Sequence, residues 1–281
     1  MQSQGVCSEA RPTRGAGERF EARATRWPGV LSVEASSGRS FGRHTHDQFG
    51  IGAVLRGAQD SASGRGQVRA RPGDLITVNP NEVHDGRPVQ GALRAWRMLY
   101  FEPTVIARQA AGLGWPPGAE FQHPVLGDAG AARAFARLHA ALAGPVDSGW
   151  SEVAGQELLV LLAGLFGRPA PSALPERLPS VRRARDRIDM APYQPAALAD
   201  LADDAGLSPY HFLRVFKART GLPPHAYRLQ RQLQRARRSL LAGQSIALAA
   251  LDAGFADQSH LTRHFVRAYG LTPGALARAV G

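Results

Sequence analysis

The sequence predicts an α+β multidomain protein, with an all-β domain first and an all-α domain last. Short apolar runs broken by Gly, Pro and Asn fill residues 20–103, a spacing typical of small sandwiches and barrels. The last third shows helical periodicity instead, and it contains two copies of one helix–Gly turn–helix pattern. A chain of 281 residues has room for two such domains, each with its own core.

Composition narrows the classes of protein to be considered. The net charge of +11 is concentrated at one end: residues 180–281 hold 15 Arg and Lys against 7 Asp and Glu, while the first 179 residues hold 19 against 16. An anionic partner is therefore expected at the C-terminal end. A single cysteine, Cys7, gives no disulfide framework, and the longest apolar run, Leu158–Phe166, is too short to span a bilayer. With no signal-peptide pattern either, we expect a cytoplasmic protein without a membrane partner.

The β domain is expected to follow a short leader. Residues 1–20 contain Gly and Arg but few apolar residues, and they are expected to be disordered. The domain itself is assigned to residues 21–126 because strand-like runs such as "FGIGAVLRG", "GDLITVNP" and "LRAWRMLYF" are separated by turn residues. In the last run Trp96, Met98 and Tyr100 alternate and so share one face of a strand. That face is core or pocket, and the core is the favoured interpretation.

A helical hairpin is expected over residues 127–166. "AARAFARLHAALA" places Phe135, Leu138 and Leu142 on one face, and "SEVAGQELLVLLAGLF" opens with Ser151 as an N-cap. The hairpin is expected to mediate dimerisation or to pack on the barrel. Four prolines within "GRPAPSALPERLPS" then predict a semi-stiff, protease-sensitive linker over 167–180, which leads to a helical domain over 181–281.

The helical domain contains the repeat. "AGLSPYHFLRVFKARTG" begins at Ala205, and "AGFADQSHLTRHFVRAYG" begins at Ala253. In each copy a glycine ends the first short helix, since glycine readily takes the left-handed conformation of a tight turn. Ser208 and Asp257 are then placed to cap the second helices. The pattern predicts two helix-turn-helix units rather than a generic bundle, which would not need both Gly turns and both Gly-x-x-Pro endings in register.

The second helix of each copy has a polar outer face. Between the copies, "PHAYRLQRQLQRARRSLLAG" predicts one helix of about 19 residues and about 28 Å. That length is close to the ~34 Å turn of B-DNA, so the two second helices could enter successive major grooves. The outward residues, which we assign to DNA binding, are Tyr210, His211, Arg214 and Lys217 in the first copy and Gln258, Ser259 and Arg263 in the second.

Residues 182–279 resemble the DNA-binding domain of AraC/XylS-type transcription regulators. The run "GF-x-D-Q-S-x-L-x-R-x-F" in the second copy is the most specific part of this resemblance. The resemblance implies that the second helix of each copy reads the major groove, with Tyr210, Arg214, Gln258, Ser259 and Arg263 at reading positions. Ala249 and Leu261 depart from the larger aliphatic and the aromatic residue usual there, which suggests a lightly packed second copy.

The front half has a resemblance of its own. "GRHTHDQFGIGAVLRG" and "RPGDLITVNPNEVHDG" resemble the two motifs of a cupin-like sensor domain, which commonly precedes this DNA-binding tail. In metal cupins such histidines and a Glu hold a divalent ion, but Gly50 or Ile51 stands at the Glu position here. Metal binding, metal-free effector recognition and a purely structural role all stay open. We favour metal-free recognition and expect no tightly bound metal and no cofactor, with an effector site made of His44, His46, His84 and Trp96.

Together these observations predict a sequence-specific, DNA-binding transcription regulator that responds to a small-molecule effector. It is not expected to be an enzyme, because the ligand set for cupin catalysis is incomplete. Its expected partners are double-stranded DNA, the effector and a second copy in a homodimer, with RNA polymerase as a further candidate. The alternative is a metal-dependent cupin protein with a tail that binds nucleic acid non-specifically. Two protected DNA segments one turn apart would favour the regulator; uniform, salt-labile binding would favour the alternative.

Overall fold

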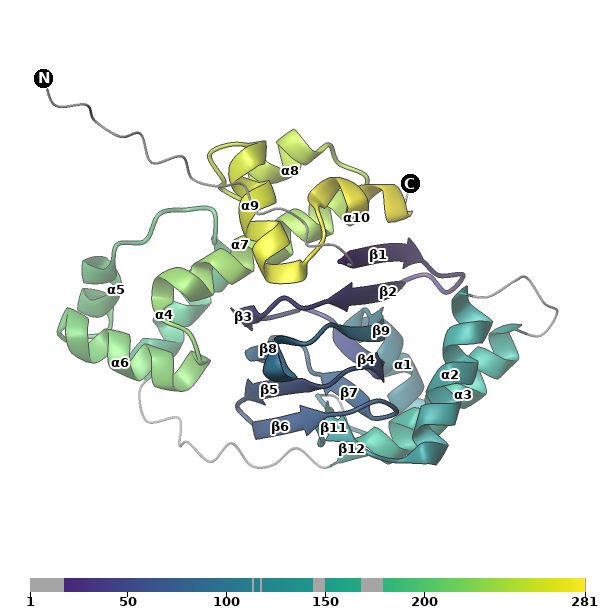
Figure 1. Cartoon of the computed structure of the whole chain (residues 1–281). Helices are drawn as coiled ribbons and strands as arrows, with labels where there is room; N and C mark the ends of the chain where they lie inside the picture. The colour runs from purple at the N-terminus through teal and green to yellow at the C-terminus, as the bar shows by residue number, and fades with distance from the viewer. Residues whose placement is uncertain (1–17, 113, 117, 144–149, 168–178, 281) are drawn as a thin grey trace, which may run out of the picture.

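A computed structural model describes residues 18–112, 114–116, 118–143, 150–167 and 179–280 of the chain. Strands fill the N-terminal half and helices the C-terminal half, and the two parts lie against each other (Figure 1). The first strand already begins at Arg19, two residues inside the segment expected to be a leader. Residues 1–17 of that leader, and residues 168–178 of the expected linker, lie outside the described residues.

The β domain is built from two main antiparallel sheets. The larger sheet has the order β1-β2-β9-β4-β7-β11 and the smaller one β3-β8-β5-β6. The strands are β1 (Arg19–Ala24), β2 (Val30–Ser37), β3 (Phe41–His44), β4 (Phe49–Arg56), β5 (Gln59–Ser63), β6 (Gly66–Ala70), β7 (Leu75–Val78), β8 (His84–Pro88), β9 (Arg94–Phe101) and β11 (Val125–Leu126).

One face of the larger sheet is covered by the helical hairpin, α2 (Ala129–Ala143) and α3 (Trp150–Leu165). Side chains that alternate on the strands, such as Ile51 and Leu99, pack there against Phe135 and Leu158 in one buried cluster. Ser151, expected as the N-cap of the second helix, lies inside α3 because that helix already includes Trp150. The hairpin therefore contributes to the core of the β domain.

Two features of this half were not predicted from the sequence. Helix α1 (Pro103–Gly112) follows β9 directly, and its buried residues Val105 and Ile106 join the same cluster as the hairpin. A two-stranded pairing of β10 (Glu120–Phe121) with β12 (Phe166–Gly167) then ties the end of α3 back to the barrel.

The C-terminal half contains both predicted helix-turn-helix units. Its helices are α4 (Pro179–Met190), α5 (Leu198–Asp204), α6 (Pro209–Thr220), α7 (Pro224–Leu241), α8 (Ile246–Asp252), α9 (Gln258–Tyr269) and α10 (Pro273–Val280). Ser208 and Asp257 cap α6 and α9 by accepting hydrogen bonds from the backbone N–H three residues on, as predicted. Gly206 and Gly254 take the left-handed conformation in the two turns, with φ of 64° and 82°.

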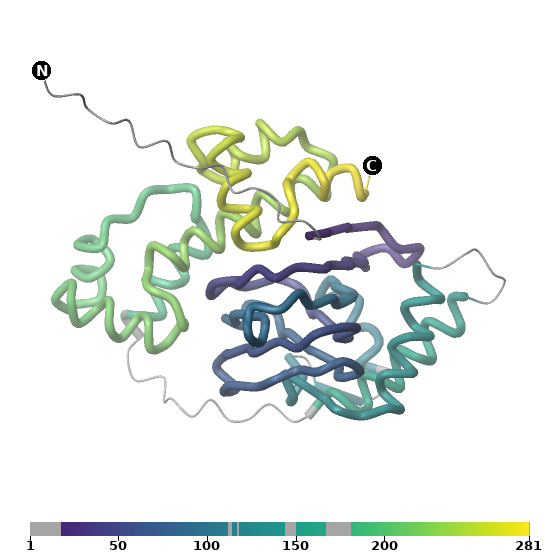
Figure 2. The backbone as a smooth tube through the Cα atoms, in the orientation of Figure 1, coloured from purple at the N-terminus to yellow at the C-terminus, as the bar shows by residue number. Residues whose placement is uncertain are grey.

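The second unit is closely packed rather than lightly packed. Ala249 and Leu261, the two departures from the family pattern, are both fully buried. They belong to a cluster that also includes Phe265 on α9 and Leu31 and Met98 of the β domain. The small side chain of Ala249 is thus accommodated in a core that the two halves share. Figure 2 shows the last helices lying along the first strands.

Candidate DNA-binding face and effector cavity

The seven residues assigned to DNA binding all lie on the solvent side of their helices. Tyr210, His211, Arg214 and Lys217 are exposed on α6, and Gln258, Ser259 and Arg263 are exposed on α9. The opposite faces are apolar and fully buried, through Phe212 and Phe216 on α6 and Leu261 and Phe265 on α9. The structure thus gathers the predicted residues into two polar faces, each at the start of a capped helix.

The positive charge on the exposed face of α9 extends beyond the residues that were assigned to DNA binding from the sequence. Arg267 lies one turn after Arg263 on α9 and is also exposed. Burial lowers the pKa of His264, and the neighbouring His260, Arg263 and Arg267 lower it further. The imidazole of His264 is therefore neutral at pH 7, and the arginines supply the positive charge of this face.

The three predicted histidines of the β domain converge. His44 and His84 are direct partners across the β3–β8 pairing, and their ring centroids lie 4.4 Å apart. His46 lies just beyond the end of β3, yet its ring is 5.0 Å from that of His44 and 5.2 Å from that of His84. One ring nitrogen from each residue falls within 4.8 Å of the others.

Backbone contacts orient two of these rings. The Nδ1 of His44 lies 2.8 Å from the carbonyl oxygen of Gly42, and the Nδ1 of His84 lies 3.0 Å from that of Glu82. A carbonyl can only accept, so Nδ1 carries the proton and Nε2 keeps its lone pair. Burial lowers the pKa of His44 to about 3 and that of His84 to about 4. Burial also holds the pKa of His46 well below its usual value, so all three rings are neutral at pH 7.

The histidines line a cavity of about 110 Å³ that extends along β9. Trp96, Met98 and Tyr100 of β9 also line it, as does Ile76 of β7. These three β9 side chains do share a face, as predicted. The face belongs to the core, because Met98 is buried in the cluster that the two halves share and Trp96 and Tyr100 pack against that cluster, and the same three side chains also line the cavity. Neutral imidazoles and aromatic rings give the cavity a largely apolar lining with a few polar groups, which is typical of small-molecule pockets.

Arg94 is a cavity residue that sequence reasoning missed. It is 1% exposed, its guanidinium lies 4.8 Å from the ring centroid of Trp96, and it donates to Gln59 and to the carbonyl of Arg39. Burial lowers its pKa to about 10, so it stays charged. Among the described residues no carboxylate forms an ion pair with it, although buried charges usually have a counter-charge. A lone Arg in a strand gives no sequence signal of such burial.

The C-terminal half contributes to the lining of the cavity. Tyr269, the last residue of α9, lines it, and its ring centroid is 5.5 Å from that of His46. Its hydroxyl is buried and has no hydrogen-bond partner among the described residues. Burial, with Asp47 nearby, raises the pKa of this hydroxyl, which is therefore protonated and available as a donor.

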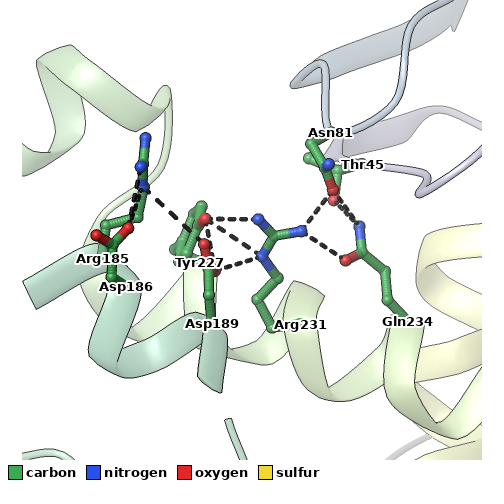
Figure 3. A network of polar contacts seen from close by, with 8 residues as sticks. All are labelled: Thr45, Asn81, Arg185, Asp186, Asp189, Tyr227, Arg231 and Gln234. Atoms are coloured by element: carbon green, nitrogen blue, oxygen red, sulfur yellow. Dashed lines mark hydrogen bonds and ion pairs between the residues drawn. The ribbon is translucent and has the colours of Figure 1, made fainter. Parts of the chain in front are cut away.

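Helix α7 holds the two halves together through polar contacts. Arg237 donates to Asp47 at 3.0 Å, and this ion pair is nearly buried, with side-chain exposures of 7% and 16%. Gln234 donates to the hydroxyl of Thr45 at 2.9 Å, and Arg231 reaches Asn81 of the β domain (Figure 3). Arg231 also pairs with Asp189 on α4 at 2.7 Å, so the network continues into the first helix-turn-helix unit.

Comparison with known proteins agrees with this architecture. Residues 28–159 match the AraC-like ligand binding domain, and residues 201–279 match a helix-turn-helix domain. The uncharacterised HTH-type transcriptional regulator YbfI of Bacillus subtilis is 27% identical over 227 residues, which are 79% of this chain and 82% of YbfI. The bifunctional transcriptional activator/DNA repair enzyme Ada of Escherichia coli is 34% identical over 110 residues, but these are only 31% of Ada.

Solved structures show the same two-part fold. An apo form of ToxT from Vibrio cholerae aligns with a TM-score of 0.57 at 10% identity, over 92% of this chain and all of that one. ToxT with a bound unsaturated fatty acid aligns with a TM-score of 0.57 at 8% identity, over 90% of this chain and 96% of that one.

A ligand-binding β domain joined to two helix-turn-helix units defines an effector-responsive, DNA-binding transcription regulator. The chain belongs to the AraC-type family of these regulators. No helix within the described residues is long and apolar enough to cross a membrane.

Proposed function

We propose that each chain reads two successive major-groove segments of double-stranded DNA, with α6 in one groove and α9 in the other. The observation that carries this proposal is the pair of exposed polar faces on α6 and α9, separated by the 18-residue helix α7. Eighteen helical residues span about 27 Å, which is comparable to one turn of B-DNA. The exposed arginines suit the acceptor pair of guanine, and Gln258 suits adenine.

Replacing Arg214 or Arg263 with alanine should weaken specific DNA binding by roughly 1–3 kcal/mol each, because each would lose a base contact that discriminates between sequences. Fluorescence anisotropy with an operator and with random DNA of equal length measures both the loss and its specificity. Arg278→Ala is the matched control, because Arg278 is an exposed arginine on α10 and belongs to neither α6 nor α9. Equal losses on both DNAs would make these residues phosphate contacts, and unchanged binding would refute the groove assignment.

We further propose that the effector binds in the cavity beside His44, His46, His84 and Trp96. Arg94 favours an effector with an anionic or strongly accepting group, since its buried guanidinium has only neutral partners among the described residues. Because Tyr269 of α9 borders the same cavity, an effector there would touch the DNA-binding half directly. We propose that the protein has no enzymatic activity, since the match to the bifunctional enzyme Ada covers only 31% of that protein. We also propose a cytoplasmic location, with RNA polymerase as a candidate partner.

We propose homodimerisation through the hairpin, the role assigned to residues 127–166. Val153 and Val160 support it: they lie seven residues apart on α3, hence on one face, and are 42% and 59% exposed. Replacing both with glutamate should convert a dimer into a monomer in analytical ultracentrifugation, since two apolar contacts would become repulsive. The control is Leu248→Glu, an exposed apolar position on α8. A double variant that sediments as the wild type does would place the dimer contact elsewhere.

A further inference from the structure

We infer that the segment around Tyr193 and the turn at Gly254 form a joint that fixes the angle between α6 and α9. These residues would position the two recognition helices without contacting bases themselves. The inference rests on the proposed reading of two major-groove segments by one chain. It adds residues outside the two polar faces that determine which spacing of the segments is bound.

The two helix-turn-helix units have separate apolar cores within the described residues. The first core contains Phe212 of α6, and the second contains Phe265 of α9. Helix α7 joins them, because its Tyr227 belongs to the first core and its Leu233 to the second. A single connecting helix sets the distance between two bodies, yet each body can still tilt about its own attachment to that helix. A contact between the units away from the helix axis would fix their angle.

Such a contact lies at the turn of the second unit. Tyr193 lies between α4 and α5, and a Cβ atom on Gly254 would stand 2.7 Å from the Cα of Tyr193 and 2.8 Å from its carbonyl oxygen. A Cβ atom essentially never comes that close to backbone, so glycine is required for this approach. The equivalent turn residue of the first unit, Gly206, has no neighbouring heavy atom within 4 Å of the same position among the described residues. Gly254 therefore has a role that Gly206 lacks.

One face of α7 holds the two segments that meet there. Arg228, Gln232 and Arg235 are spaced by four and three residues, so their side chains share a face of the helix. Arg228 donates to the carbonyl oxygen of Gln194 at 3.1 Å, on the side of the first unit. Gln232 donates to the carbonyl oxygen of Gly254 at 3.2 Å, in the second unit. The same helix face thus binds the backbone of both units.

Arg235 contacts both units at once. Its guanidinium lies 5.0 Å from the ring centroid of Tyr193, within the range of a cation–π contact. Its Nε donates to the carbonyl oxygen of Asp252 at 2.8 Å. Asp252 is the last residue of α8, where backbone carbonyls have no partner within the helix. One side chain therefore couples the loop of the first unit to the turn that leads into α9.

The β domain also touches both units, since Val83 belongs to the first core and Leu31 to the second. A test of the joint must therefore leave these contacts in place. Substitutions at Gly254 and Gly206 do so, and a difference between the two variants reports on the joint.

Gly254→Ala and Gly206→Ala in the full-length chain form this matched pair. Both place a Cβ atom on a left-handed turn residue, but only Gly254→Ala pushes the segment at Tyr193 away. DNA that the wild type selects from a random pool is compared with the same DNA carrying one base pair more or fewer between its two protected segments. The wild type and Gly206→Ala should prefer the selected spacing by at least about 10-fold, since one lost base contact already costs about that much. Gly254→Ala should lose this preference or transfer it to another spacing.

A distance measurement tests the joint without DNA. Ala218 on α6 and Ser259 on α9 are exposed and can carry spin labels as Ala218→Cys and Ser259→Cys, with Cys7→Ser removing the native thiol. The distribution of distances between the labels should be shifted or broader in Gly254→Ala than in the wild type and in Gly206→Ala.

Arg235→Ala covers the case in which Gly254→Ala fails to fold, because it removes two side-chain contacts without straining the backbone. It should change the distances and the spacing preference in the same direction. Variants of Gly254 and Arg235 that keep both properties of Gly206→Ala would overturn the joint and leave the reading of two segments intact. A wild type that protects a single segment, or binds all spacings equally, would overturn the proposed reading of two grooves, and the label distances would still decide on the joint.

Discussion

Replacing Asp47 with alanine is expected to lower the free energy of unfolding by about 3–5 kcal/mol, the usual cost of removing one partner from a buried ion pair. Arg237 is 5% exposed and reaches from α7 to Asp47 of the β domain. Its remaining acidic neighbour, Glu102, is 3.8 Å away, too far for a hydrogen bond. The Nη2 of Arg237 already has no hydrogen-bond partner among the described residues, so the loss of Asp47 leaves the guanidinium poorly compensated.

Urea denaturation measures this loss, and small-angle scattering shows how the protein accommodates it. The variant can regain hydration of Arg237 by separating the two halves, in which case a larger radius of gyration accompanies a smaller loss of stability. The matched control is Asp60→Ala, which removes an exposed pair with Arg69 and should change little, because solvent screens such pairs. An Asp47→Ala variant as stable and as compact as the wild type would show that the ion pair does not hold the halves together.

Acidification should destabilise the protein through His139, by about 2 kcal/mol between pH 6.5 and pH 4 after allowance for partial solvation of the ring. His139 lies on α2 with its Nε2 3.0 Å from the hydroxyl of Ser32, under the larger sheet. Burial, the largest cause, and the charge of Arg97 lower its pKa, and Glu34 acts in the opposite direction, with a net result of about 4. In the unfolded chain this histidine takes up a proton near pH 6.5, while in the folded chain it stays neutral until about pH 4.

The sign follows from this difference. Between these two pH values the unfolded state binds more protons, so stability falls as the pH falls, and below about pH 4 this group adds no further loss. His139→Gln should therefore show a shallower decline of stability than the wild type in denaturation curves taken from pH 7 to pH 4. His225→Gln, at an exposed position on α7, should decline as the wild type does. Identical slopes for wild type and His139→Gln would refute the assignment.

Local sequence signals predicted the helix-turn-helix half well. Ser208, Asp257 and the two turn glycines act within three or four residues of themselves, so their roles can be inferred without the fold. Helix α1 was not predicted because, among residues 103–111, only Val105, Ile106 and Ala110 are buried, and so few buried positions give a weak periodic pattern.

Some features of the candidate sites could likewise be predicted from local sequence, whereas others depend on how the two halves pack. The polar faces of α6 and α9 follow from helical period, and the shared side of His44 and His46 from their spacing. The Arg237–Asp47 pair joins residues 190 apart, and Tyr269 meets His46 only because the two halves dock. Nothing in the local pattern of either segment encodes that docking. The roles of the individual site residues stay predictions until the variants are measured.

Helix α7 sets an angle as well as a length. An α-helix turns by about 100° per residue, so a single residue inserted into α7 would rotate everything after it by that amount and shift it by only about 1.5 Å. In B-DNA each base pair is rotated by about 35° relative to the one before it, since there are about 10–10.5 base pairs per turn. If the number of base pairs between the two DNA segments changes, one segment rotates about the DNA axis relative to the other. Because α7 is one continuous 18-residue helix, α6 and α9 cannot reorient to match that rotation, whereas two units joined by a flexible linker could. Operators of this regulator should therefore share one spacing between their two segments. A site with the right bases in both segments but a different number of base pairs between them should not be bound specifically.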